Sequence, residues 1–537
     1  MLILIVLLLV AIPARADDFS ELRRLPVQDG GRLKPLDTLA AESVRFITGK
    51  ARFQNEDPMW TSLRWMAKPE AALDEQCIEF RNLELKKKLG LDPERRWYSF
   101  KELSENAEVR SRQTAVHNKM RSKEELTPED KEFNQLLARM QTLLAILDGT
   151  LWKVVPNSVD LTGQWTSLAE LRDMDGPARE AMGKLLEAAA TGDPSKAAQA
   201  SPPVCQALAT MGPLPAPGTM EREVHYNNFH AFRKAWALYV LGFFLILFAP
   251  SAQSKLYWLG MASAGAGFAL HCYGFLLRCL IAGRPPVTNM YESVIWVAFG
   301  AVLFALIFET IYRNRFYLLA ALAGASVALI LADNLPAVLD PTIKPLTPVL
   351  RNNFWLTVHV LTITLSYAAF LLALGLGHMV VWCYAFAQDR KERLKALNLA
   401  LYKAIQVGVL LLAAGTILGG VWANYSWGRF WGWDPKEVWA LIALLGYLAL
   451  LHGRYAGWLR HYGLAAGSIV AFQGVLMAWY GVNFVLGAGL HSYGFGNGGV
   501  EYVGAFCLAE LFFVAVMTWR YKMATRASRV DPPDPAL

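Results

Sequence analysis

The chain has 537 residues, of which 54% are hydrophobic, 12% aromatic and only 18% charged. These averages combine two different parts, because most charged residues precede about residue 232 and long apolar runs follow it. The net charge of +7 does not indicate a nucleic-acid-binding protein, since membrane proteins concentrate Lys and Arg in the loops that set their orientation. We therefore expect no nucleic-acid site.

The first residues, MLILIVLLLVAIPARADD, contain an apolar stretch too short to cross a bilayer. Ala14-Arg15-Ala16 follows, a small-x-small pattern typical of signal peptidase sites. No Lys or Arg precedes the apolar stretch, which is unusual for a signal peptide. Residues 1–16 are therefore interpreted as a signal peptide or as a short apolar leader that is retained, and residues from Asp17 onward as exported.

Residues 17–232 are predicted to form an exported, mainly helical domain. Charged stretches with apolar residues three and four apart, such as KEELTPEDKEFNQLLARMQTLLAILDG, are typical of surface helices. Thr127-Pro128-Glu129-Asp130 supplies a cap, a proline at the first helical position and acids in the first turn, so it predicts a helix start. The Pro- and Gly-rich segment SPPVCQALATMGPLPAPGTMERE predicts a linker at the end of the domain.

This exported domain shows no catalytic arrangement. Its Gly30-Gly31 turn carries Arg32 and Lys34, which predict either a solvated turn or a docking point for a partner. The six cysteines of the whole chain are scattered, and none forms a CxxC pair. Neither a zinc site nor a self-contained thiol relay is therefore indicated.

Past the linker, residues 233–520 are predicted to form a membrane domain, followed by a cytoplasmic tail of residues 521–537. Apolar runs of roughly 17 to 30 residues recur there, which is the length that crosses a bilayer. The sequence thus predicts an all-α fold, a polytopic membrane helix bundle behind a helical exported domain. The nine expected spans are residues 233–250, 255–280, 290–312, 316–332, 355–386, 400–422, 437–452, 462–485 and 501–520.

The distribution of basic residues predicts the orientation of this bundle. If the N-terminal domain is exported, alternate links lie in the cytoplasm and should be rich in Lys and Arg. The links expected outside carry few: Arg284, Lys344, Arg351, Arg429 and Lys436. Those expected inside, with the tail, carry more: Lys255, Arg313, Arg315, Arg390, Lys391, Arg393, Lys395, Arg454, Arg460, Arg520, Lys522, Arg526 and Arg529.

The stretch NYSWGRFWGWDPKEVWALI, Asn424 to Ile442, lies on the outer side between two apolar runs. An interfacial aromatic belt accounts for tryptophans in many membrane proteins. Two glycines that let the backbone approach closely, and the polar Asp434-to-Glu437 run, favour a ligand site here instead. Three tryptophans would form its surface: Trp427, Trp431 and Trp433.

Two histidines are predicted on the same outer side. His359 lies about one turn into a span entered from that face, and His491 lies in the outer link GAGLHSYGFGNGGVE. Haem is a flat, largely apolar ligand that needs aromatic surfaces, cations for its propionates and axial nitrogens, so two neutral imidazoles above the tryptophans suit it. For His359 taken alone, a hydrogen-bonded histidine between helices is the alternative.

A third histidine, His452 in LALLHGRYAG, is predicted at the inner end of its span. It would belong to a second site near the cytoplasmic face, or it would cap the helix end, where an imidazole beside the last carbonyls is favourable. His271 and His378 lie within spans without matching partners and are predicted to be packing residues.

The tryptophan-rich stretch WGRFWGWDPKEVWALI resembles the WWD signature of the cytochrome c assembly family. Its WDPKE ending resembles the CcsA/ResC subunit of the system II cytochrome c synthase more than CcmC or CcmF. GRPPVTNMYESVIW, Gly283 to Trp296, resembles the family's outer loop, and HVLTITLSYAAF, LLHGR and GLHSYG resemble its histidine-bearing segments. The resemblance covers about residues 233 to 520 in unbroken order.

The resemblance implies roles for individual residues. His359 and His491 would ligate the iron of an outer haem b, and His452 would ligate the iron of an inner haem. The expected catalytic residues are Trp427, Trp431, Trp433 and Asp434. The further cofactor-binding residues would be Asn289, Tyr291 and Glu292.

The resemblance also implies that the protein is a holocytochrome c synthase (cytochrome c haem lyase). Haem would move to the outer WWD site, where its vinyl groups form thioethers with the CxxCH thiols of exported apocytochrome c. The expected partners are apocytochrome c, membrane lipid and a ResB/CcsB-like subunit, because the family normally works with that subunit and only an exported domain precedes the spans here. The expected location is a bacterial inner membrane, with the N-terminal domain and the WWD loop in the periplasm.

Two alternatives remain from the sequence. The first is a haem exporter or loader in the manner of CcmC, which passes haem to a carrier without catalysing attachment. The second is a structural membrane scaffold whose histidines and tryptophans only pack.

Overall fold

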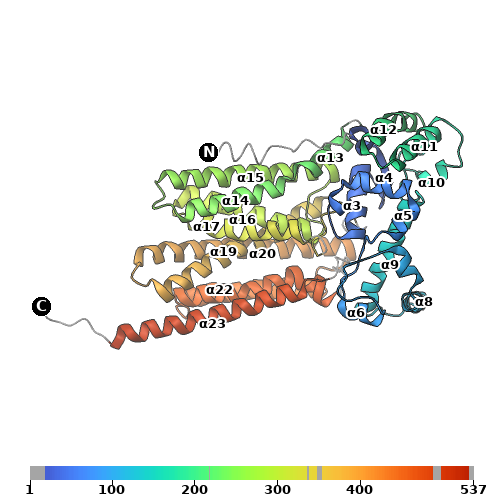
Figure 1. Cartoon of the computed structure of the whole chain (residues 1–537). Coiled ribbons are helices and arrows are strands. Elements are labelled where there is room, and N and C mark those ends of the chain that lie inside the picture. Colours follow the sequence, from blue (N-terminus) through green and yellow to red (C-terminus); the bar gives the residue numbers. More distant parts are fainter. Residues whose placement is uncertain (1–18, 217, 336–337, 347–352, 488–497, 531–537) are drawn as a thin grey trace. The chain divides into compact units, whose positions relative to one another are not determined.

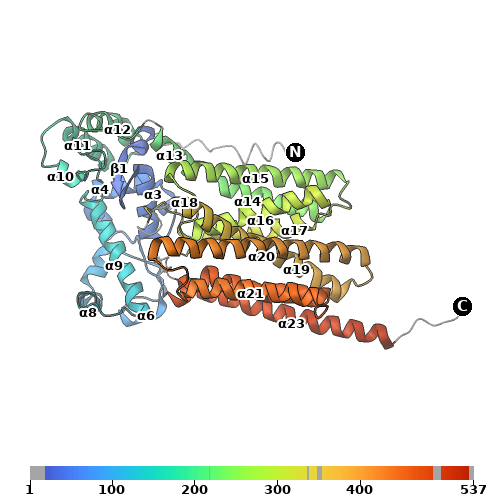
Figure 2. The same cartoon turned by 180° about the vertical axis from the view of Figure 1, so that it is seen from behind.

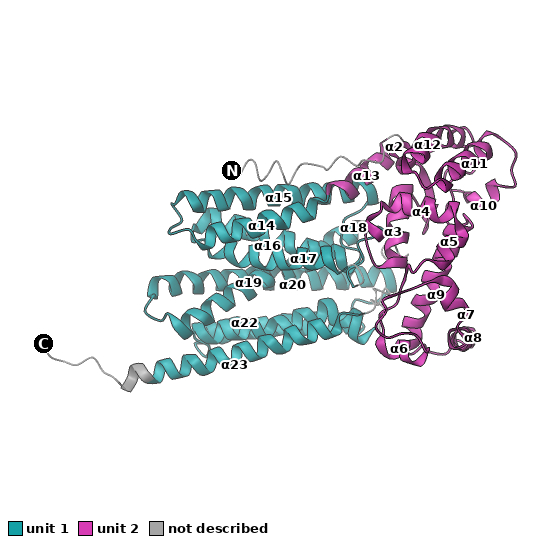
Figure 3. Cartoon of the chain, in the orientation of Figure 1, with its two compact units in different colours: residues 1–10, 230–537 teal, residues 11–229 magenta. Residues whose placement is uncertain are grey.

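The structure is a computed structural model that describes residues 19–216, 218–335, 338–346, 353–487 and 498–530. The predicted leader of residues 1–16 and His491 lie outside the described residues. The chain divides into two compact units, Ala11–Phe229 and the part from His230 to Leu537 (Figure 3). Both units are built mainly from helices, which confirms the predicted all-α class (Figure 1).

The N-terminal unit contains two hydrophobic cores. One packs α2, α3, α4, α11 and α12 around Leu22, Leu63 and Trp152, all nearly inaccessible to solvent. The other gathers α6 to α9 around Trp65, Tyr98 and Phe133. The elements are α2 (Ser20–Arg24), β1 (Pro26–Asp29), β2 (Arg32–Pro35), α3 (Leu36–Thr48), η1 (Phe53–Asn55), α4 (Pro58–Ala67), α5 (Pro69–Asp74), β3 (Ile78–Glu79), α6 (Leu83–Lys88), β4 (Trp97–Tyr98), α7 (Phe100–Glu105), α8 (Ala107–Arg121), α9 (Pro128–Leu147), α10 (Leu168–Leu171), α11 (Pro177–Ala190), α12 (Pro194–Ala209) and α13 (Thr219–Phe229).

The Gly30-Gly31 turn is the tip of a hairpin in which β1 pairs antiparallel with β2. Arg32 donates two hydrogen bonds of 2.7 Å to the buried Glu223 carboxylate. Lys34 is only 5% exposed and bonds the Glu42 carboxylate at 2.5 Å. The prediction of a solvated turn is therefore wrong for these cations, because the distant Glu223 binds Arg32 and the nearby Glu42 and Asp29 bind Lys34.

The predicted helix start at Thr127 is confirmed. Thr127 and Asp130 form a capping box at the beginning of α9, with Pro128 at its first position. The predicted linker, in contrast, is helical in its first part, because α12 continues through Ser201–Ala209. Pro202 and Pro203 are tolerated there because Val204 and Leu208 are buried in the core, and the Ser201 hydroxyl donates to the Ala198 carbonyl at 2.8 Å.

Among the described residues, nine helical segments are long and apolar enough to cross a membrane, which confirms the predicted number. They lie side by side as a bundle when viewed from either side (Figures 1 and 2). The elements are α14 (Ala231–Leu247), α15 (Lys255–Ala282), α16 (Met290–Tyr312), α17 (Phe316–Asn334), α18 (Asn353–Trp355), η3 (Leu356–Val360), α19 (Leu361–Phe386), α20 (Lys391–Trp427), α21 (Pro435–Tyr455), α22 (His461–Leu476), η4 (Met477–Leu486) and α23 (Val500–Val530).

Two helices are longer than the apolar runs that predicted them. α20 begins at Lys391 rather than near residue 400. Its first turns bury Leu394, Leu397 and Leu401 on one face, and the charged side chains of the same turns lie on the exposed face. α23 continues past residue 520 to Val530, so helix occupies part of the predicted tail. Hydropathy detects the apolar centre of such helices and not their amphipathic ends.

Small residues let the membrane helices approach closely. A Cβ added at Gly260 of α15 would lie 2.5 Å from a side-chain atom of Ile246 on α14. A Cβ at Gly408 of α20 would lie 2.5 Å from the Phe370 ring on α19. Inside a membrane no hydrophobic effect drives helices together, so their association depends on close packing. Glycine at such contacts permits that packing.

The two histidines predicted to pack within spans have different surroundings. His271 is fully buried, and its ring atoms lie 3.1 Å from the Tyr239 hydroxyl and 3.1 Å from the Ile295 carbonyl oxygen. His378 has a partner that the sequence did not reveal, because its Nε2 lies 2.8 Å from the Glu510 carboxylate on α23. This pair joins α19 to the last helix of the bundle.

The cysteines of the N-terminal unit are expected to be chemically inert. Burial raises the pKa of the Cys77 and Cys205 thiols to about 12, and the thiolate is the reactive form. Neither cysteine should therefore be alkylated by a maleimide at pH 7 in the folded full-length chain, and both should react after denaturation. Peptide mass spectrometry measures this, and rapid native labelling of Cys77 would contradict the burial.

Candidate functional site

His359 lies in η3, a π-helical turn between α18 and α19. Its Nδ1 lies 2.8 Å from the carbonyl oxygen of Gly415 on α20. A carbonyl only accepts hydrogen bonds, so Nδ1 carries the proton. Neutral His359 then has its lone pair on Nε2, which is the arrangement of a histidine prepared to bind a metal. Single π-helical turns occur frequently at functional sites.

The His359 ring lies on a glycine-lined face of α20. A Cβ added at Gly419 would stand 2.7 Å from Cε1 of the imidazole, so a larger residue there would displace the ring. The Trp422 ring, one turn further along α20, lies 5.7 Å from the imidazole, and Trp422 is only 8% exposed. Gly415, Gly419 and Trp422 thus form one seat that positions His359.

The tryptophan-rich stretch forms a short loop between two helices. α20 ends at Trp427, and Gly428 follows with φ of 69°, a left-handed conformation that suits glycine at a helix end. Asp434 caps α21 by accepting from the Lys436 amide at 3.0 Å. Glu437 completes the capping box and also accepts from the Gly432 amide at 2.8 Å. The two acids of the motif therefore hold the loop in shape.

This loop folds back onto α20 beside His359. A Cβ at Gly420 would lie 2.6 Å from the Phe430 ring, and Gly420 directly follows the glycine that seats His359. The Trp431 and Trp433 rings meet edge to face with centroids 6.0 Å apart. Trp433 is 72% exposed and Trp427 is half-buried. An accessible aromatic surface therefore adjoins the His359 seat.

The Asn-x-Tyr-Glu-Ser motif forms the start of α16. The Asn289 side chain caps this helix by accepting from the Glu292 amide at 2.8 Å. Glu292 is fully buried, and its carboxylate accepts from Arg278 at 2.8 Å and from the Thr288 hydroxyl at 2.6 Å. Tyr291 is 7% exposed, and the Arg278 guanidinium lies 5.2 Å from its ring centroid.

These contacts attach the segment of residues 338–346 to the bundle. Arg278 also donates to the Pro341 carbonyl at 3.0 Å, and Arg284 donates to the Lys344 carbonyl. The nearby apolar cluster contains Val287, Leu356 and Trp422, so it links this region to the His359 helix and its seat. Direct ligand contacts of Asn289, Tyr291 and Glu292 stay a prediction, as does a catalytic role for Asp434; the contacts described here are structural.

His452 occupies the last turn of α21, and its Nδ1 lies 2.8 Å from the Leu448 carbonyl. The residue is exposed on the helix surface. Pro435 begins the same helix, so His452 lies roughly 25 Å from the tryptophan-rich loop along the helix axis. The structure therefore separates His452 from His359, as the sequence predicted, whereas the position of His491 is not described.

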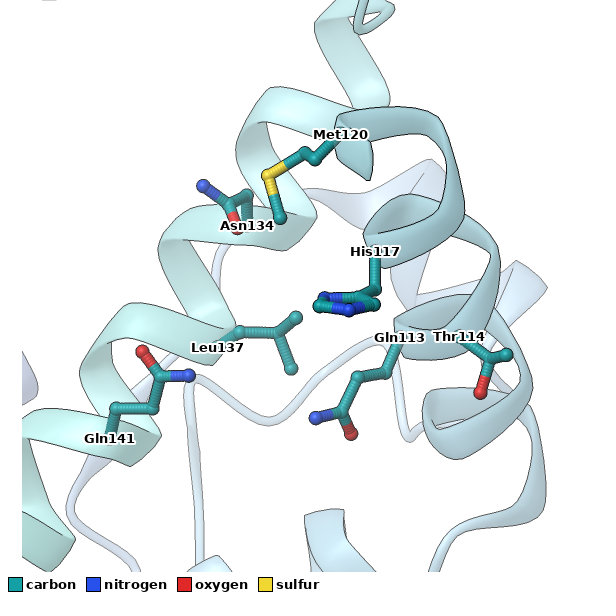
Figure 4. A pocket seen from close by; sticks show the side chains of 7 residues that line it. All are labelled: Gln113, Thr114, His117, Met120, Asn134, Leu137 and Gln141. Atoms are coloured by element: carbon teal, nitrogen blue, oxygen red, sulfur yellow. The ribbon is translucent and has the colours of Figure 1, made fainter. Parts of the chain in front are cut away.

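A groove of about 270 Å³ lies between α8 and α9 of the N-terminal unit (Figure 4). His117 and Met120 of α8 face Leu137 and Asn134 of α9 across it. In the described ranges, no three or more His, Cys, Asp or Glu side chains lie close enough together to share a metal ion.

Comparisons with known proteins agree with this arrangement. The family model described as "Cytochrome C assembly protein" matches residues 287–491, which contain the Asn-x-Tyr-Glu-Ser motif, the His359 seat and the tryptophan-rich loop. CcsA, the cytochrome c biogenesis protein of Parasynechococcus marenigrum, is 34% identical over 301 residues, covering 48% of this chain and 94% of that protein. The chain belongs to the cytochrome c assembly family.

Other relatives extend the match. CcsA of Chlorella vulgaris is 32% identical over 311 residues, covering 47% of this chain and 95% of that protein. Protein NrfI of Wolinella succinogenes is 29% identical over 492 residues and covers 87% of this chain, so the similarity reaches well into the N-terminal unit. The chain spans about half of NrfI, namely 53% of its length. With its nine apolar helices, this member of the family is a multi-pass membrane protein with a role in cytochrome c biogenesis.

Sequence reasoning missed the residues that support His359. Gly415 and Gly419 stand four apart in GTILGGVW, which places them on one face of a helix. That spacing signals a close contact with another element. It does not say that the neighbour is a histidine, because η3 reaches α20 only through the fold.

The Arg278–Glu292 pair is expected to be important for stability. Both side chains are 0% exposed, so Glu292→Leu would leave a buried positive charge and cost about 3–5 kcal/mol. The detergent-solubilised protein should lose many degrees in a size-exclusion thermal-stability assay. Asp333→Asn is the matched control, because its partner Arg233 is 52% exposed and such pairs contribute about 0–1 kcal/mol. Equal melting temperatures for the two variants would contradict the predicted cost.

Proposed function

We propose that this chain is the haem-handling subunit of a cytochrome c synthase, which brings haem to the outer loop and promotes its attachment to exported apocytochrome c. The observation that carries the proposal is the His359 seat. Gly415 holds the imidazole in the tautomer with its lone pair on Nε2, and Phe430 of the tryptophan-rich loop packs against Gly420, the residue that follows Gly419 in α20. Family membership supports the assignment to cytochrome c maturation.

The residues around His359 suit haem b as the substrate. Haem requires an axial nitrogen together with apolar surface beside it. His359 offers the nitrogen, and Trp433, 72% exposed, offers aromatic surface on the adjoining loop. We assign the second axial nitrogen to His491, which completes a bis-histidine outer site.

The chain itself does not have to supply a reacting group for this reaction. Each thiol of the CxxCH segment adds across one vinyl group, so that its sulfur forms a C–S bond and its hydrogen ends on the neighbouring carbon. Atoms and electrons balance without an added oxidant or reductant. The nucleophile belongs to apocytochrome c, so the chain contributes by fixing the position and orientation of the porphyrin. Trp427, Trp431, Trp433 and Asp434 would form and support that surface.

His452 would bind a second haem near the cytoplasmic end of the bundle. Its Nδ1 is hydrogen-bonded to the Leu448 carbonyl, so Nε2 would be the ligand atom. The residue is exposed on α21. An exposed ligand needs a partner to complete the iron coordination, so a ResB/CcsB-like membrane subunit would supply the second nitrogen. The bundle would lie in a bacterial inner membrane, with the N-terminal unit and the tryptophan-rich loop in the periplasm, as the basic links indicate.

The seat can be tested without removing the histidine. Gly419→Ala should lower the haem content of the purified protein several-fold, because the new Cβ would displace the His359 ring. His359→Gly should lower it too, and added imidazole should partly restore the haem absorbance only in that variant. Gly265→Ala is the matched control, because nothing lies within 4 Å of the added Cβ. Unchanged haem content in both His359→Gly and Gly419→Ala would rule out this site.

The reaction itself is tested by co-expression with a ResB-like subunit and an apocytochrome c. Covalent haem on the cytochrome is expected, and His452→Gly should alter a haem population that His359→Gly leaves in place. Haem that binds this chain but never reaches the cytochrome would instead support an exporter or loader. A purified protein without any bound haem would support a structural scaffold.

A further inference from the structure

The Glu79 carboxylate of the N-terminal unit lies beneath three arginines. Glu79 ends β3, and its side chain is only 4% exposed. Arg81 and Arg96 each donate from Nε to the same carboxylate oxygen, Oε1, at 2.7 Å and 2.8 Å. Arg139 of α9 has a terminal nitrogen 3.8 Å from the other oxygen and donates to the Glu79 backbone carbonyl. Three guanidiniums therefore share one carboxylate.

This cluster carries more positive charge than is needed to neutralise Glu79. Within the described residues, Glu79 is the only acid that forms an ion pair with any of the three arginines. Lys50 adds a fourth cation, because its ammonium and the Arg96 guanidinium lie 4.3 Å and 4.7 Å from the Trp97 ring centroid. The charge of Glu132 also acts on the cluster. Four cations thus stand against two acids, and two positive charges remain.

The surplus charge is accessible, and aromatic rings lie within it. The Arg81 side chain is 64% exposed, and Lys50 is exposed. The Trp97 ring is half-buried beside Lys50. Phe46 is 39% exposed, and the Arg139 guanidinium lies 5.8 Å from its ring centroid. Arginine together with Trp and Phe is the composition that protein interfaces favour.

The buried acid fixes the cations in position. A Cβ at Gly49, which ends α3, would clash with the Glu79 carboxylate, so the carboxylate lies directly against the backbone there. The arginines that bind it are thereby ordered before any ligand arrives, which lowers the entropy cost of binding. In contrast, Arg32 and Lys34 of the β1–β2 hairpin are balanced by their own acids.

We propose that this basic aromatic surface, formed by Phe46, Lys50, Arg81, Arg96, Trp97 and Arg139, binds an acidic segment of a partner protein. Guanidiniums bind carboxylates through paired N–H donors, and a nonpolar side chain of the same segment would cover the rings. A small inorganic anion would use the cations alone and leave the rings uncovered. The interaction goes beyond the proposed function, because it involves neither haem nor the membrane helices.

Binding is tested with the detergent-solubilised full chain and a fluorescein-labelled peptide of Glu-Glu-Tyr repeats, followed by anisotropy. A peptide with Gln in place of Glu should not bind, and added salt should weaken the acidic peptide. Arg81→Gln and Lys50→Gln should each lower its affinity roughly fivefold. Both variants leave Glu79 paired with Arg96 and Arg139, so the fold is retained.

The matched control removes the same charge elsewhere in the unit. Arg179 is 52% exposed and is paired with Asp175, so Arg179→Gln should leave the affinity for the acidic peptide unchanged. An equal loss in Arg179→Gln and Arg81→Gln would show that only the net charge of the chain matters, and it would overturn the proposal. Unchanged affinity in both Arg81→Gln and Lys50→Gln would overturn it too.

Photochemical crosslinking locates the bound peptide. A benzoylphenylalanine in place of Phe46 should crosslink to the acidic peptide, whereas the same group in place of Leu144, which is also 39% exposed, should not. Equal crosslinking from both positions would overturn the assigned surface. Displacement of the peptide by an equimolar amount of inorganic phosphate would identify a small-anion site and would likewise overturn the proposal.

Discussion

The hydrogen bond between the His359 Nδ1 and the Gly415 carbonyl is the interaction on which the site depends. It selects one tautomer of a neutral imidazole, and it ties η3 to the middle of α20. The contact is possible only because Gly419 leaves room for the ring and because the π-helical turn places His359 against that helix face. Adjacent Gly420 receives Phe430, so the same few residues of α20 position both the histidine and the loop.

Charged side chains elsewhere in the bundle are paired in ways that fix the positions of helices and loops. Arg278 and Glu292 neutralise one another at 0% exposure and hold the segment around Pro341. His378 and Glu510 join α19 to α23. Buried charges are expensive in an apolar medium unless they are paired, so each pair specifies one arrangement of the helices.

Different residue types of the tryptophan-rich motif have different structural roles. Asp434 and Glu437 accept backbone hydrogen bonds and set the loop, glycines provide space, and the indoles provide surface. The Arg429 guanidinium packs against Gly432, and Lys436 interacts electrostatically with Asp434. Within this motif, the contacts of Asp434 and Glu437 that the structure shows are therefore structural ones.

Sequence alone determined the features that depend on local composition. Apolar length predicted nine spans, the Thr127 cap predicted the start of α9, and the motif around Trp431 indicated the family. The sequence did not determine contacts between distant residues, such as Arg32 with Glu223, His378 with Glu510 or His359 with Gly415. Periodicity and hydropathy report on one element at a time, whereas the tautomer of His359 depends on the Gly415 carbonyl that the fold brings against it. For that reason the sequence indicated which residues matter, and only the tertiary structure decided how each of them is held.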